Sequence, residues 1–147
     1  MEPLTERELA LLNSTRRAVL ASSRPNGKAR LVPITFVFDN GLLYTALDEK
    51  PKSVSDPRDL ARVQDIERDP RVSVLVDTWS EDWSTLGWVR VEGKARLIGS
   101  DAESAAEHAH AVGLLRAKYV QYATQALETL PIIRIELGAA RSWFARP

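Results

Sequence analysis

The sequence predicts an α+β protein of mainly β character, built as one domain over residues 1–147 around an antiparallel barrel of roughly six strands. Three observations indicate this class. Strand-like runs alternate with tight turns in the first half, helical patterns occur only at the ends and in crossovers, and Gly93 interrupts a long alternating run. A glycine inside a strand often marks a bulge or bend, which a small closed barrel needs.

The first half of the chain indicates a short helix followed by a three-stranded meander. Thr5 and Glu8 have the spacing of a capping box, which starts the helix. Asn40-Gly41 is the strongest hairpin signal in the sequence, and Pro25-Asn26-Gly27 predicts another tight turn. The strands are therefore expected over residues 18–22, 29–38 and 42–47.

The second half continues with a helix and then longer strands. Asp56 is expected to cap a helix that has Pro57 in its first turn and ends at Asp69-Pro70. Residues 72–76 are nearly all apolar, so this strand is predicted to be buried on both faces. The remaining elements are expected to be a loop at 79–86, a strand at 88–98, helical stretches at 101–115 and 116–130, and an extended segment at 132–144.

Composition excludes several classes of protein. Lys plus Arg number 20 and Asp plus Glu number 20, so no basic excess points to a nucleic-acid partner. The chain has no cysteine, which rules out disulfides, thiolate metal sites and cysteine nucleophiles. No apolar run approaches the roughly 20 residues that span a bilayer, and the polar N-terminus lacks a signal-peptide core. We therefore expect a cytoplasmic protein with no membrane partner.

Familiar catalytic and nucleotide-binding motifs are also missing from the sequence. It contains no G-x-G-x-x-G, P-loop or G-x-S-x-G pattern. His108 and His110 stand two residues apart on a predicted helix, so they point in different directions. We expect both to lie on the surface of an exposed helix, and we predict no metal site.

Two lysines mark a candidate phosphate site. Lys50 and Lys52 follow a predicted strand directly, and the helix capped by Asp56 comes next. Lysine is a point charge suited to phosphate, and Pro51 between the two stiffens the loop. Spacing alone leaves open a simple solvated basic loop.

A second cluster is rich in tryptophan. Trp79, Trp83 and Trp88 lie close together in the sequence, and Arg90 shares a strand face with Trp88. Tryptophan offers a flat face for stacking on a ring system and a large area for burial at a subunit interface. Core packing explains Trp79 and Trp83 less well, because they stand in a polar loop. Arg90 could contact a ring carbonyl or a phosphate, or pair with Glu92.

At these residues the chain resembles the pyridoxamine 5′-phosphate oxidase-like split-barrel proteins, and in particular their deazaflavin-dependent oxidoreductase branch. The resemblance extends from about Thr15 to Phe144. It rests on Asp48-Glu49-Lys50-Pro51-Lys52, Asp69-Pro70-Arg71-Val72, Glu81-Asp82-Trp83, Trp88-Val89-Arg90 and Gly93-Lys94-Ala95-Arg96. The longer vitamin-converting oxidases carry extra basic residues for their substrate, and this chain lacks such a set.

The resemblance implies a six-stranded antiparallel split β-barrel with flanking helices that forms a homodimer, with two cofactor sites at the subunit interface. It implies that Lys50 and Lys52 meet the cofactor phosphate. The ring would lie along the second and third strands and be faced by aromatic residues, some of them from the partner subunit. The residues so implied are Pro33, Ile34, Thr35, Thr45, Ala46, Trp79, Trp83, Trp88 and Arg90.

The leading hypothesis is an oxidoreductase that uses coenzyme F(420) to transfer hydride to a small conjugated or aromatic molecule. A close alternative keeps the fold and binds FMN. A third reading is a protein that binds a cofactor or a tetrapyrrole without turnover, and a fourth is a structural interaction domain. No side chain stands out as an obligatory acid or base. Tyr44 could donate a proton, although packing on a strand explains it better.

Overall fold

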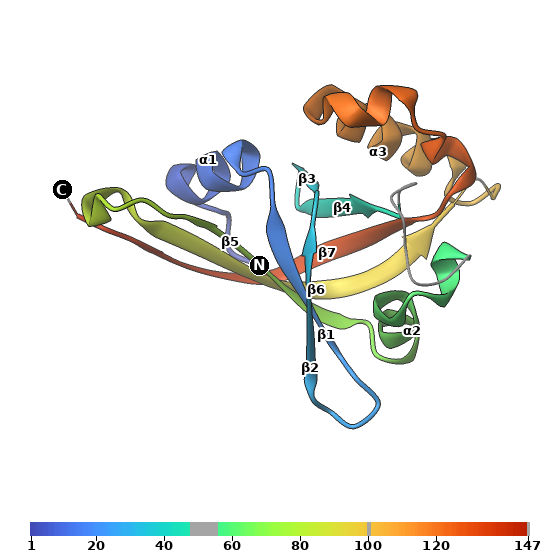
Figure 1. Cartoon of the computed structure of the whole chain (residues 1–147), viewed down its shortest axis with the longest axis horizontal. Helices are drawn as coiled ribbons and strands as arrows, with labels where there is room; N and C mark the ends of the chain where they lie inside the picture. Colours follow the sequence, from blue (N-terminus) through green and yellow to red (C-terminus); the bar gives the residue numbers. More distant parts are fainter. Residues whose placement is uncertain (48–55, 100, 147) are drawn as a thin grey trace.

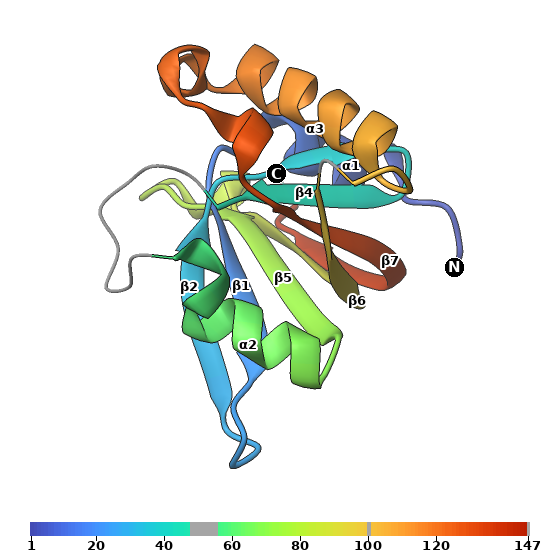
Figure 2. The same cartoon turned by 90° about the vertical axis from the view of Figure 1, so that its right-hand side faces the viewer.

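The computed structural model describes residues 1–47, 56–99 and 101–146, and within them the chain forms one curled antiparallel sheet with helices against it (Figures 1 and 2). Seven strands follow the spatial order β2-β1-β5-β6-β7-β4-β3. The strands are β1 (Ala18–Ser23), β2 (Ala29–Ile34), β3 (Val37–Asp39), β4 (Leu42–Ala46), β5 (Arg71–Thr78), β6 (Gly87–Ile98) and β7 (Ile132–Phe144). The α-helices are α1 (Glu6–Ser14), α2 (Ala61–Arg68) and α3 (Ala105–Lys118).

The described strands number seven instead of six because the expected strand at 29–38 breaks in two. β2 pairs with β1 at one edge of the sheet, and β3 pairs with β4 at the other edge. Phe36, at the break, is fully buried, and its N–H donates to the Tyr119 hydroxyl, which itself donates to the Phe36 carbonyl. The Tyr119 hydroxyl therefore satisfies the backbone N–H and C=O of Phe36, which a continuous strand would have paired. With these groups satisfied, the chain can cross from one edge of the curled sheet to the other.

The local signals of the first half are confirmed. Thr5 and Glu8 form both hydrogen bonds of the capping box that starts α1. Asn40 and Gly41 both have positive φ, 48° and 81°, in the turn between β3 and β4.

The helical predictions of the second half are confirmed in part. Asp56 caps a short 3₁₀ turn, Pro57–Asp59, that leads into α2. The helix α3 runs on to Lys118, and the rest of the expected stretch at 116–130 contains only the 3₁₀ turns Val120–Thr124 and Leu127–Thr129.

The concave side of the sheet carries the main core. Alternate residues of β1, β5, β6 and β7 point inward together with Leu12 of α1 and Val63 of α2. A second apolar cluster lies between α3, β4 and the start of β7, where Tyr44 and Leu115 are buried. In Figure 2, α3 lies above β4, whereas α2 lies in front of β1 and β5.

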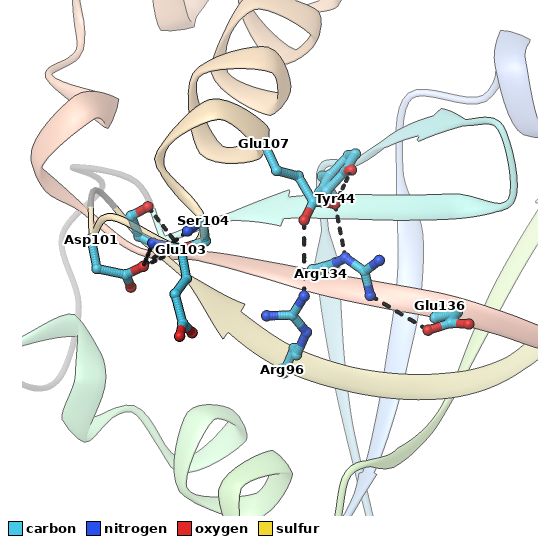
Figure 3. Close-up of polar contacts among 9 residues, drawn as sticks. Tyr44, Arg96, Asp101, Glu103, Ser104, Glu107, Arg134 and Glu136 are labelled. Atoms are coloured by element: carbon cyan, nitrogen blue, oxygen red, sulfur yellow. Dashed lines mark hydrogen bonds and ion pairs between the residues drawn. The ribbon is translucent and has the colours of Figure 1, made fainter.

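A polar network holds α3 against the sheet (Figure 3). The Tyr44 hydroxyl donates to Glu107 Oε2 at 2.6 Å, and Arg134 Nε donates to the same oxygen at 2.8 Å. Burial tends to raise the pKa of Glu107, but these two hydrogen bonds outweigh it and leave that pKa below its usual value. The carboxylate therefore ties β4 and β7 to the helix.

A bulge in β7 decides which of its side chains face outward. The register between β6 and β7 shifts at Glu92 and Gly93, where Gly138 is the extra residue on β7. Before the bulge Ile133, Ile135 and Leu137 point into the core, whereas after it the odd-numbered residues point out. The break at Gly93 expected from the sequence is confirmed, and it inverts the facing of the C-terminal half of β7.

The prediction that residues 72–76 are buried on both faces is wrong. In β5, Val72, Val74 and Val76 are buried, but Leu75 between them is 40% exposed. No helix of the described chain covers the outer face of the sheet at this point, so an apolar run that looks doubly buried has one free face (Figure 1). None of the described helices has the length and apolarity to cross a bilayer.

Candidate functional site

The free outer face of the sheet contains a large, mostly apolar pocket. Its volume is about 690 Å³, within the range of small-molecule and cofactor sites. Strands β1, β2, β5, β6 and β7 all contribute to it. The lining residues are Val19, Ala21, Leu31, Ser73, Leu75, Asp77, Thr78, Trp79, Leu86, Gly87, Trp88, Arg90 and Trp143.

Three tryptophans lie around this pocket. Trp88 and Trp143 are directly opposite each other on β6 and β7, and Trp79 extends the wall from the end of β5. Trp79 and Trp143 are 68% and 49% exposed, so neither serves as core packing in this chain. Such a group of large flat rings, open to solvent, is suited to stacking against a planar ligand.

Arg90 supplies the positive charge of the pocket. Its guanidinium lies over the Trp88 ring, 5.6 Å from the ring centroid. Within the described residues it forms no ion pair, so the pairing with Glu92 that the sequence left open is not made. An arginine that forms no ion pair with the described residues, at the edge of an apolar pocket, can contact a carbonyl or an anionic group of a ligand.

The structure brings together only part of the site expected from the sequence. Trp79, Trp88 and Arg90 line the pocket, and Pro33 lies beside it because it is exposed on β2 and paired with Val19. Trp83 is 67% exposed in the 3₁₀ turn Trp83–Thr85, next to the pocket in sequence but not among its lining residues.

The other expected ring contacts lie elsewhere. Ile34, Thr45 and Ala46 are buried at 6%, 2% and 6% exposure, on strands that pack against the core. The Thr35 hydroxyl is 2.6 Å from the Tyr122 hydroxyl, at the break between β2 and β3. Lys50 and Lys52 lie outside the described residues, so their contact with a phosphate stays a prediction.

Sequence reasoning missed Trp143, Leu31 and Leu75 as pocket residues. Leu75 was missed because the apolar run at residues 72–76 predicted a strand that is buried on both faces. Trp143 stands in an alternating segment, but its facing depends on the bulge at Gly138 of β7, whereas the sequence predicted a break only at Gly93 of β6. Only the pairing of β6 with β7 brings it opposite Trp88.

Two titratable groups that the sequence considered do not belong to this pocket. Burial, and then the hydrogen bond to Glu107, raise the pKa of Tyr44 well above its usual value, and its hydroxyl serves the α3 network. The expectation that both histidines lie on the surface is wrong for His108. It is 4% exposed, with Nε2 at 2.7 Å from the Leu130 carbonyl, because α3 turns this face toward the segment before β7.

The curled antiparallel sheet with its flanking helices is a split-barrel fold. Residues 4–144 match the family model described as pyridoxamine 5′-phosphate oxidase. The chain belongs to the pyridoxamine 5′-phosphate oxidase family.

Solved structures share the fold over almost the whole chain. An FAD-binding protein from Mesorhizobium loti is 20% identical, with a TM-score of 0.69 over 95% of this chain and 94% of that one. A conserved hypothetical protein from Mycobacterium tuberculosis is 23% identical, with a TM-score of 0.72 over 97% and 86%. A protein described as F420 reductase is 16% identical, with a TM-score of 0.66 over 94% and 98%. At these identities the likeness concerns the fold.

Proposed function

We propose that this protein is an oxidoreductase that binds coenzyme F(420) and transfers hydride to a small conjugated or aromatic molecule. The observation that carries the proposal is the apolar pocket bordered by Trp79, Trp88 and Trp143. It lies on the open face of the sheet, in a chain of the pyridoxamine 5′-phosphate oxidase family. The F420 reductase and the FAD-binding protein of the same fold support a tricyclic ring cofactor. FMN is the alternative occupant, since it also brings a phosphate and a tricyclic ring.

The residues of the pocket fit such a cofactor. Three tryptophans offer stacking faces, the floor is apolar, and Arg90 is free to meet a ring carbonyl or phosphate. Lys50 and Lys52 are proposed to hold the phosphate. When bound, the cofactor would supply the hydride chemistry, while the chain would orient it and exclude water from it. The pocket lining includes one carboxylate, Asp77, to which we assign no acid–base role.

We also propose that two copies of the chain associate through this outer face, so that the cofactor lies between them. Large apolar side chains are exposed there and in the adjoining β5–β6 loop. They are Leu31, Leu75, Trp79, Trp83 and Trp143. A patch of this kind on a protein surface marks an interface more often than a free surface.

The decisive experiment is a parallel titration of the purified protein with FMN and oxidised coenzyme F(420), followed by quenching of tryptophan fluorescence. Binding of coenzyme F(420) at micromolar or lower concentration, with little response to FMN, supports the deazaflavin oxidoreductase. Preference for FMN moves the protein to the flavin branch. A wild-type protein that responds to neither cofactor contradicts the proposal.

Turnover separates the enzyme from a protein that only binds. The loaded protein should reduce one or more members of a panel of quinones, nitroaromatics and conjugated ketones when supplied with reduced cofactor. Tight binding without reduction of any acceptor would favour a cofactor- or tetrapyrrole-carrying protein. Sedimentation velocity measures the dimer, with and without cofactor, and a monomer at high concentration would contradict the association.

A further inference from the structure

Two arginines stand directly opposite each other on the outer face of the sheet. Arg90 of β6 is the register partner of Arg141 of β7, and both are exposed. Both point outward, because inward-facing Val89 and Val91 flank Arg90 and the bulge at Gly138 turns Arg141 to the same side. The two guanidinium groups therefore project from neighbouring strands on one face.

Neither arginine has an acidic partner in the described part of the chain. Apart from their backbone ladder bonds, no side-chain hydrogen bond or ion pair joins Arg90 or Arg141 to another described residue, and within this part of the chain the Arg90 guanidinium contacts the Trp88 ring. Glu92 follows on the same face of β6 and Asp77 lies opposite Trp88 on β5, yet neither forms an ion pair with the two arginines. Arg141 also borders a shallow hollow with the N-terminal residues, including Glu2, again without an ion pair.

Like charges placed directly opposite on adjacent strands destabilise a sheet. The unfavourable pair is tolerated when an anion lies between the two groups, and the planar forks of two arginines suit a carboxylate or a phosphate. Two adjacent arginines without an ion pair among the described residues, beside a mostly apolar pocket, are therefore a candidate anion site.

The aromatic pair next to the two arginines indicates which kind of anionic ligand would fit. Trp88 and Trp143 are also register partners, and they stand two residues along β6 and β7 from the two arginines. Residues two apart on a strand are separated by about 7 Å. The face thus presents an aromatic pair and a cationic pair about 7 Å apart along the strands, so one ligand with a planar ring and an anionic group can contact both.

We propose that Arg90 and Arg141 form an anion site at the edge of the tryptophan pocket, which selects a planar ligand carrying a carboxylate or phosphate. This inference rests on the proposed function and extends it, because it predicts that the substrate or the cofactor tail carries a negative charge at this position. The anion is the carboxylate of an acidic aromatic substrate when Lys50 and Lys52 hold the cofactor phosphate as proposed, and it is that phosphate itself when they do not. Both share this chemistry, and the ligands below tell them apart.

The test compares matched ligands by isothermal titration calorimetry. 2-Naphthoate and neutral 2-naphthamide represent a substrate with and without the charge, and FMN and riboflavin represent a cofactor with and without the phosphate. The variants are Arg141→Gln, Arg141→Lys and, as a control, Arg24→Gln in the exposed turn after β1. Circular dichroism confirms that each variant is folded.

For a substrate anion, Arg141→Gln is expected to weaken 2-naphthoate about tenfold or more while leaving 2-naphthamide unchanged. For a cofactor phosphate, it weakens FMN but not riboflavin. Either result supports the site, provided that Arg141→Lys loses less affinity than Arg141→Gln and Arg24→Gln loses none.

Three results overturn the proposal. The first is unchanged binding of both anionic ligands, and the second is equal loss for the charged and neutral member of each pair. The third is unchanged ligand binding with a weaker dimer, which would assign the arginines to a carboxylate of the partner subunit. If the wild type binds 2-naphthoate through Arg141 but neither FMN nor coenzyme F(420), the anion site stands and the proposed function fails.

Discussion

Trp88 and Trp143 are direct register partners on β6 and β7, and both face the open side of the sheet, where they line the same pocket. They come from two strands far apart in the sequence, joined by α3 and the 3₁₀ turns. This pair gives the pocket an aromatic wall without using core residues. Its loss should therefore affect binding much more than folding.

Trp143→Ala is expected to weaken binding of the preferred cofactor by about tenfold, since an aromatic stacking contact contributes about 1 kcal/mol beyond its buried area. The far-UV circular dichroism spectrum should be unchanged and the melting temperature, compared at one low protein concentration to limit association, should change little, because the side chain is half exposed in the single chain. Fluorescence titration and thermal denaturation measure the two effects. Val120→Ala, at an exposed apolar residue away from the pocket, is the control. A large loss of stability with unchanged affinity would make Trp143 a structural residue.

Gly93→Ala should destabilise the fold by about 1–3 kcal/mol. A Cβ at this position would collide with the Glu136 carbonyl oxygen, and a backbone atom in a paired strand cannot move aside easily. Chemical denaturation measures the change. Gly113→Ala is the matched control, since a Cβ there meets nothing within 4 Å inside α3. That variant should gain about 0.5–1 kcal/mol, so destabilisation by both alanines would count against the steric explanation.

Asp65→Asn is expected to lower the free energy of unfolding at neutral pH by about 2–3 kcal/mol, below the usual cost of breaking a buried pair because Arg30 is partly exposed. The Asp65 carboxylate is 1% exposed and accepts hydrogen bonds from Ser22 Oγ at 2.8 Å and Arg30 Nε at 2.6 Å. Glu67→Gln, on the exposed side of the same helix, should cost little.

The Asp65 contribution should also depend on pH. Burial raises the pKa of Asp65, but the hydrogen bonds from Arg30 and Ser22 outweigh it, so the folded pKa lies below the unfolded value. The stabilisation is therefore complete above the unfolded pKa, about 3.9, and is lost as pH falls through the lower folded pKa. Urea denaturation from pH 7 to pH 2.5 should show the difference between wild type and Asp65→Asn shrinking at the acidic end. A constant difference would show that the carboxylate charge is not the cause.

Tyr44→Phe should cost about 1 kcal/mol, because it removes one hydrogen bond while Arg134 still satisfies Glu107. Glu107→Ala should cost more, about 2–3 kcal/mol, since it leaves the buried Tyr44 hydroxyl without its acceptor. Glu103→Ala, at the exposed start of the same segment, is the control. Urea denaturation ranks the three variants, and the reverse order of the first two would contradict the network in Figure 3.

The sequence predicted well the features that near neighbours determine. The capping box at Thr5 and Glu8 and the turn at Asn40-Gly41 depend on hydrogen bonds and backbone sterics within a few residues, and both are confirmed. The family resemblance likewise rests on short motifs, and the match over residues 4–144 confirms the pyridoxamine 5′-phosphate oxidase family, while the deazaflavin-dependent branch stays a proposal. Trp79, Trp88 and Arg90 were placed in the candidate site because one short segment carries all three.

Tertiary structure alone decided the rest of the pocket. The bulge at Gly138 inverts the facing of β7, so Arg141 and Trp143 turn outward although Ile135 and Leu137 point into the core. The exposure of Leu75 and the burial of His108 depend in the same way on which elements cover a strand or helix face. Strand register and face coverage come from contacts between segments distant in sequence, and a local pattern of side chains holds no information about the partner that will lie opposite it.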